Sequence, residues 1–107
     1  MNYNFPSHIN GDTFDGVEFT ITVNGSSLNL TSGSVVMTVL VLGQPVLFST
    51  VNSKMAVVGT PTSGVVEFSQ QVVSFNAYGI FPYEITFYLG DGSIRTYISG
   101  TWEITRS

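Results

Sequence analysis

The sequence predicts an all-β chain of short antiparallel strands, and three observations lead to this expectation. Apolar and polar residues alternate with a period of two in several stretches, which is the pattern of strands that bury one face. Turn-forming pairs such as Asn24-Gly25 and Asp91-Gly92 separate these stretches. No window shows the 3.6-residue spacing of an amphipathic helix, and no capping box precedes an apolar run.

The N-terminal third begins with a segment that is expected to be extended. Residues 1–10 form this leader, in which Pro6 fixes its own φ and restricts the residue before it. The first clear strand is predicted over residues 13–23, with Gly16 marking a bulge or bend. Residues 28–30, after the next turn, are predicted to be a short strand or the connection into the next strand.

The run over residues 34–42 is apolar in both phases of a strand. A sandwich strand needs one apolar phase for its own core, so the other phase would leave an apolar row on the surface. Either another segment such as the leader covers this row, or a partner does. We therefore predict self-association, or at least about 1,000 Å² of surface buried against a neighbour in a particle. The candidate interaction surface consists of Val35, Met37, Val39 and Val41 from this run, with Tyr88 and Tyr97 from the later hairpin.

The C-terminal stretch over residues 81–104 is the element around which the other strands are expected to pack. Its first strand places Tyr83, Ile85, Phe87 and Leu89 in one apolar row, and a return strand follows the Asp91-Gly92 turn. Ser99-Gly100 is expected to break that return strand. Trp102 and Ile104 then resume the pattern in a shared phase, so both are predicted to be core residues.

Shorter strands are predicted over residues 46–51, 55–58, 65–69 and 71–75. Together the chain offers about seven to nine short strands at roughly ten-residue intervals, which favours an antiparallel immunoglobulin-like β-sandwich over a barrel. The 107 residues are expected to form a single domain with the leader at its start.

The charge of the chain excludes several partners. Only 9% of the residues are charged and the net charge is −4, with Lys54, Arg95 and Arg106 scattered through the sequence. Binding to nucleic acid or to an anionic membrane needs clustered cations, so neither is expected. There is no cysteine, no signal-peptide pattern, and no apolar run near the length of a membrane span. A surface of small neutral polar groups is inexpensive to desolvate, which favours burial in an assembly and is also compatible with a monomer.

The acidic residues do not form a recognisable metal site. Asp12, Asp15 and Glu18 are the densest group, and hard cations such as calcium take several oxygen ligands. Their spacing does not match an EF-hand loop, and the strand pattern around Glu18 points side chains apart. They are therefore interpreted as turn and surface acids, and no metal or cofactor is predicted.

A catalytic centre is not expected either. His8 is the only histidine, so a Ser-His-Asp triad would have to be built on the leader. Glu67, Glu84 and Glu103 alternate with apolar residues on strands, which indicates solvated faces rather than the paired carboxylates of a glycosidase. The chain is therefore predicted not to be an enzyme.

The aromatic residues support a second hypothesis, a small carbohydrate-binding or adhesion module. Tyr88 and Tyr97 lie on the polar phases of their strands and are expected to be near each other across the hairpin. Outward tyrosines serve protein contacts as well as sugar stacking. The aromatic set considered for a stacking platform is Tyr3, Tyr78, Tyr83, Tyr88, Tyr97, Phe81 and Trp102.

Four motifs together carry a family resemblance that covers nearly the whole chain. They are Phe5-Pro6 followed by Gly11-Asp12-Thr13-Phe14, the run from Phe19 to Gly25 with Leu28-Asn29-Leu30-Thr31, Tyr83-x-Ile85 before Asp91-Gly92, and the run from Thr96 to Thr105. In this order and spacing the chain resembles the immunoglobulin-like N-terminal domain of phage upper baseplate proteins and related tail-fibre proteins.

The resemblance implies a structural, non-catalytic domain that anchors receptor-binding or fibre components on the tail. Members of that family continue into further domains, whereas this sequence stops at Ser107, so a free-standing adaptor or a capsid or tail decoration protein is also expected. The expected partners are other virion proteins or further copies of the chain, docked through sheet faces and edges. The expected location is the virion, assembled in the cytoplasm of the host bacterium.

Overall fold

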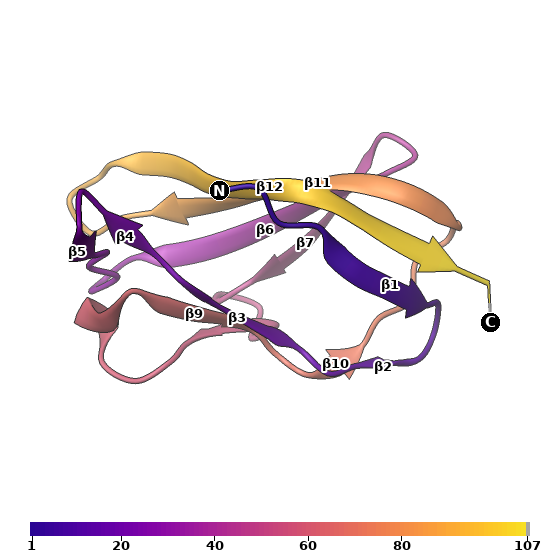
Figure 1. The fold of residues 1–107 in the computed structure, drawn as a ribbon, viewed down its shortest axis with the longest axis horizontal. Coiled ribbons are helices and arrows are strands. Elements are labelled where there is room, and N and C mark those ends of the chain that lie inside the picture. Colours follow the sequence, from indigo (N-terminus) through magenta and orange to yellow (C-terminus); the bar gives the residue numbers. More distant parts are fainter. Residues whose placement is uncertain (107) are drawn as a thin grey trace.

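Two layers of strands form the structure, a computed structural model that describes residues 1–106 (Figure 1). The larger layer is a five-stranded sheet in which the only parallel pairing joins the first strand to the last. Its strands, in spatial order, are β1 (Phe5–Ile9), β12 (Ile94–Thr105), β11 (Gly79–Tyr88), β6 (Ser34–Val41) and β7 (Gln44–Ser49).

The facing layer is a smaller antiparallel sheet of β3 (Val17–Thr20), β9 (Val65–Phe68) and β8 (Met55–Val57). Two short ladders accompany it, β2 (Thr13–Phe14) with β10 (Gln71–Val72), and β4 (Thr22–Val23) with β5 (Ser26–Ser27). A single 3₁₀ turn, η1 (Pro61–Ser63), is the helical element of residues 1–106, and none of these residues forms a helix that is long and apolar enough to cross a membrane. The prediction of an all-β, antiparallel architecture is confirmed, and the arrangement is compatible with a β-sandwich.

The core lies between the two layers and is centred on one tryptophan. Trp102 of β12 has no exposed surface, and its ring centroid lies 5.6 Å from that of Phe68 on β9 and 5.1 Å from that of Phe14 on β2. The edge-to-face geometry of these rings adds to the stabilisation from buried area. Ile104 is also buried, so the prediction that Trp102 and Ile104 are core residues is confirmed.

The predicted break at Ser99-Gly100 is wrong, because β12 runs without interruption from Ile94 to Thr105. Gly100 has a different role, which follows from its surroundings. A Cβ atom placed on Gly100 would stand 2.0 Å from the carbonyl oxygen of Tyr3, far inside van der Waals contact. The glycine therefore allows the N-terminal segment to cross β12 at close range.

The extended leader contains a strand that the sequence did not predict. Residues Phe5–Ile9 form β1, which pairs in parallel with β12, and the pairing places Phe5 beside Trp102 and His8 beside Ile104. Phe5 and His8 are both buried. Their spacing of three, with a register shift between them, is not the period of two that identifies a strand from sequence.

Candidate interaction surface

Strand β6 turns the predicted interaction residues inward. The four residues assigned to the surface from this strand have between 0% and 6% of their surface exposed, and they belong to the hydrophobic core: Val35, Met37, Val39 and Val41. The prediction that they form an interaction surface is therefore wrong. Either phase of this apolar strand was able to face the second layer, and packing selected this one. The phase that remains outside carries Val36, Thr38 and Leu40.

The two tyrosines assigned to the same surface lie on different faces of the sheet. Ile85 pairs with Ile98 and Thr86 pairs with Thr96, which leaves Tyr97 as the extra residue of a β-bulge. The bulge directs Tyr97 to the buried Phe87, with 5.6 Å between the ring centroids, and Tyr97 is half-buried. Tyr88 is exposed on the outer face. Tyr88 and Tyr97 are therefore not neighbours on one face, as had been expected, and no local sequence pattern indicates the bulge.

Exposed apolar side chains gather instead where the β6–β7 turn meets the start of β11, and we name these four residues the hairpin corner. Thr38 pairs with Leu47 and Leu40 with Pro45, so the two leucines are diagonal neighbours on the outer face. A depression of about 200 Å³ extends from Leu40 to Pro82 on β11, and Thr38 and Glu84 also line it. The hairpin corner consists of Leu40 (43% exposed), Leu42 (75%), Leu47 (52%) and Ile80 (65%).

The outer face of the five-stranded sheet, which holds most of this corner, is nearly uncharged. Cross-strand pairs such as Thr86 with Thr96 supply neutral hydroxyls, and the charged groups on this face are Glu84 and Glu103. The outer face of the three-stranded sheet differs, because Glu18 lies directly opposite Glu67. Like charges in this position repel each other. Each outer face thus carries two glutamates, but those of the larger, five-stranded sheet face uncharged partners, Ser99 and Ile80.

The free edge of β7 is poorly suited to the addition of a further strand. Thr50 donates its N–H to the carbonyl of Val35 at 3.0 Å. In an antiparallel pair the hydrogen-bonding residues alternate, so the backbone polar groups of residues 45, 47 and 49 point away from β6. Pro45 has no N–H to offer. Asn52 accepts the Ser49 N–H at 2.9 Å and donates to the carbonyl of Leu47 at 3.2 Å. These contacts use up most of the edge, as in proteins that resist edge-to-edge association.

The surroundings of the only histidine indicate a structural role. His8 is 5% exposed and lies beside Phe14, with 5.6 Å between the ring centroids. Its Nε2 atom is 3.1 Å from the carbonyl oxygen of Val73, which joins the first strand to the segment after β10. This partner satisfies the Nε2 atom of the buried imidazole, and the contact serves to hold β1 against the segment after β10.

The acidic side chains are not brought together in a way that supports catalysis or metal binding. Asp12, Asp15 and Glu18 are all exposed, and residues 1–106 contain no group of three His, Cys, Asp or Glu residues able to hold a metal ion. Glu67 belongs to the three-stranded sheet, whereas Glu84 and Glu103 lie on the five-stranded sheet. A glycosidase pair would have to flank one cleft, and these three do not.

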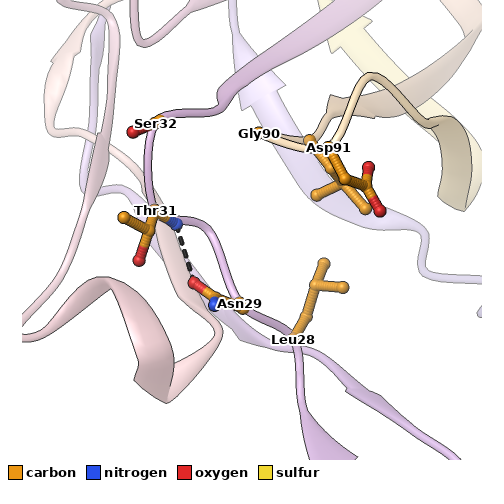
Figure 2. A pocket seen from close by; sticks show the side chains of 7 residues that line it. Leu28, Asn29, Thr31, Ser32, Gly90 and Asp91 are labelled. Atoms are coloured by element: carbon orange, nitrogen blue, oxygen red, sulfur yellow. Dashed lines mark hydrogen bonds between the residues drawn. The ribbon is translucent and has the colours of Figure 1, made fainter.

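An open cleft of about 410 Å³ lies between two loops, as shown in Figure 2. Its polar side chains are already hydrogen-bonded within their own loops, because Asn29 accepts the Thr31 N–H at 2.9 Å and Asp91 accepts the Ser93 N–H at 2.8 Å. The Ser93 N–H and hydroxyl lower the pKa of Asp91. None of the residues lining the cleft is aromatic, so it offers no sugar-stacking surface.

The aromatic side chains do not form a shared platform. Phe81, Tyr83 and Trp102 are buried. Tyr78 and Tyr88 are exposed but lie at opposite ends of β11, separated by about 30 Å at the rise of an extended strand. That separation exceeds the reach of one sugar ring.

Comparison of the chain with protein-family models, with curated proteins and with solved structures found no match.

Proposed function

We propose that this domain is a non-enzymatic structural protein of a phage virion. Its role is that of an adaptor, anchor or decoration component of the tail, baseplate, fibre or capsid. The observation that carries the docking role is the hairpin corner on a nearly uncharged sheet face. The motifs that resemble phage baseplate and tail-fibre domains supply the virion context, and two facing antiparallel layers support an immunoglobulin-like type of sandwich.

The physical case for docking rests on exposure and charge. Leu40, Leu42 and Leu47 expose between 43% and 75% of their surface, at neighbouring positions on one β-hairpin. Contiguous exposed apolar surface of this kind marks an interaction site, since each buried leucine contributes about 1.5–3 kcal/mol. Depletion of charge is also the compositional signature of interface cores. The partners are other virion proteins or further copies of this chain, and the location is the particle.

A catalytic role has no comparable support in the structure. His8 is buried against Val73, and the acidic side chains are dispersed over both layers. The carbohydrate hypothesis also loses its main support, because the exposed tyrosines are far apart. Binding of the isolated protein to immobilised glycans, abolished by Tyr88→Ala, would favour that alternative over the proposal.

Particle incorporation tests the proposed function directly. Particles would be purified on a density gradient from a culture that produces the chain, and the chain would be quantified by mass spectrometry against known virion proteins. We expect a fixed ratio across independent preparations. Absence from intact particles would refute the proposal.

A surface variant then tests the docking face. Leu47→Lys should remain folded and lose incorporation, because a lysine ammonium would have to be desolvated in the interface. Val72→Lys is the matched control, since Val72 is 64% exposed but belongs to β10 outside the five-stranded sheet. Equal loss of incorporation in both variants would argue against docking through this face.

A further inference from the structure

Two tight turns in the chain have the same backbone geometry but different residues. Asn24-Gly25 connects β4 to β5 with φ angles of 53° and 81°, and Leu42-Gly43 connects β6 to β7 with φ angles of 52° and 80°. Two-residue turns with positive φ at both positions strongly favour Asn-Gly. A leucine at the first position is unusual, because the left-handed region is costly for residues with a bulky side chain.

Exposure makes Leu42 still harder to explain within the monomer. Its side chain is 75% exposed, so it contributes little to the core of its own domain. Turn geometry and solvation therefore both favour a polar residue at this position. Burial of the leucine side chain by association would offset its unfavourable effect on the isolated fold.

A receptor for such a side chain lies beside Leu42 in the same molecule. An open groove of about 240 Å³ lies between the β6–β7 turn and the segment that precedes β11. A cavity of about 150 Å³ is enough for a benzene-sized group, so this groove has room for a leucine side chain. The groove is lined by Val41, Leu42, Gln44, Val46, Ser74, Phe75, Asn76 and Ala77, none of which is charged.

We propose that this end of the domain binds a second copy of the chain, with Leu42 of each copy inserted into the groove of the other. A projecting leucine next to an apolar groove makes the surface self-complementary, which is what a two-fold symmetric contact requires. The other hairpin-corner residues, Leu40, Leu47 and Ile80, lie at the same end of the five-stranded sheet on its outer face. This inference rests on the proposed function, because it assigns a partner to the same docking site.

Charge also favours a second copy at this end. The groove carries no ionic group, so two copies bring no like charges together there. Pairing through the three-stranded sheet would instead oppose the Glu18 and Glu67 carboxylates of both copies. Because Pro45 and Asn52 occupy most of the β7 edge, side-chain packing rather than strand addition holds the two copies together.

The first experiment measures self-association by sedimentation over a range of concentrations. Wild-type protein should show a reversible monomer–dimer equilibrium, and Leu42→Asn should raise the dimer dissociation constant at least about tenfold, since it removes two buried leucines from each dimer. Val51→Asn is the matched control, because Val51 is 78% exposed in a turn outside the hairpin corner. It should leave the dimer unchanged.

Thermal melting at a concentration where both proteins are monomeric completes the first experiment. Leu42→Asn should melt at the same or a higher temperature than wild type, because Asn-Gly is the preferred pair for this turn. Weaker dimerisation without loss of monomer stability separates an interface role from a folding role. A clear fall in the monomer melting temperature would place Leu42 in the fold and overturn its assignment as an interface anchor.

The second experiment blocks the groove and leaves the leucine in place. Ser74 is exposed and lines the groove, so Ser74→Arg should fill it and abolish dimerisation. Mixing Ser74→Arg with Leu42→Asn should then restore a weaker dimer, in which the intact leucine of the first enters the open groove of the second. Failure of either single substitution to weaken the dimer, or a mixture that stays monomeric, would overturn reciprocal insertion.

The outcomes distinguish this inference from the proposed function. A wild-type protein that stays monomeric at about 1 mM, a weak limit of specific association, overturns the second-copy inference, and its presence in purified particles would still support the virion role. A dimer that depends on Leu42, made by a chain that is absent from particles, supports the second copy and refutes the virion role.

Discussion

Replacing Gly100 by alanine tests how the N-terminal segment is held. The new Cβ atom would stand 2.0 Å from the carbonyl oxygen and 2.7 Å from the carbonyl carbon of Tyr3. Both are backbone atoms, so the collision is not relieved by a side-chain rotation. We expect residues 1–4 to move away from β12, while the strand itself remains paired with β11.

The cost follows from the hydrogen bonds that such a movement breaks. Tyr3 donates to Ser99 at 2.9 Å, Ser99 donates to Met1 at 3.1 Å, and Thr101 donates to the Asn4 side chain at 3.1 Å. The hydroxyl of Tyr83 also donates to the carbonyl of Tyr3. At about 1 kcal/mol for each of the four bonds, less about 0.4–1 kcal/mol gained because alanine restricts the unfolded chain, Gly100→Ala should cost about 3–3.6 kcal/mol.

Thermal and urea unfolding measure this cost, and Ser99→Ala is the matched control, because its side chain is exposed beside the same crossing. Ser99→Ala should change the stability by less than about 0.5 kcal/mol. A double-mutant cycle with Tyr83→Phe then identifies the cause, since the phenol bond is already lost in Gly100→Ala and its removal should cost nothing further. Gly100→Ala with wild-type stability, or with an undiminished effect of Tyr83→Phe, would refute this account of the crossing.

Three further predictions follow from the core. Trp102→Ala should cost about 3–5 kcal/mol in urea unfolding because it leaves a cavity at the centre of the aromatic cluster, and an unchanged melting temperature would contradict this. Val39→Lys should unfold the domain while Leu40→Lys leaves it folded by circular dichroism, because only Val39 is buried; equal tolerance of both would show that the phase of β6 had been misassigned. Burial, with a smaller contribution from nearby Tyr3, raises the pKa of Tyr83 above its usual value near 10, so its contribution to stability is fully present below about pH 10 and is lost as the pH rises towards the folded pKa. Melting temperatures from pH 8 to 11 should therefore fall less steeply in Tyr83→Phe, and identical slopes would count against this effect.

Much of the fold could be predicted because strand alternation is a local property. The rows of β11 and the shared phase of Trp102 and Ile104 follow from the period of two, since side chains on one face of a strand need the same environment. The break at Gly16 was also predictable, and it separates β2 from β3. A Cβ atom on Gly16 would lie 2.7 Å from the Phe68 carbonyl oxygen, which explains the glycine there.

The candidate site was harder to predict, because its position depends on which phase of β6 faces the second layer. Both phases are apolar, so periodicity did not distinguish Val39 from Leu40. The hairpin corner also depends on which residues of β7 and β11 lie beside Leu40, and register supplies that information. The sequence signal that was available was a leucine before glycine at a tight turn.

The amino-acid sequence alone determined the all-β class, the low charge and the apolar rows, because each is set by residue type and near-neighbour spacing. Tertiary structure decided the parallel pairing of β1 with β12, the inward turn of Tyr97 at the bulge, and the crossing at Gly100. The strand pairing and the crossing join segments that are distant in the chain, and the bulge adds one residue to the register of β12 with β11. A local pattern states which side chains need burial, whereas the partner that buries them is chosen by the packing of the whole domain.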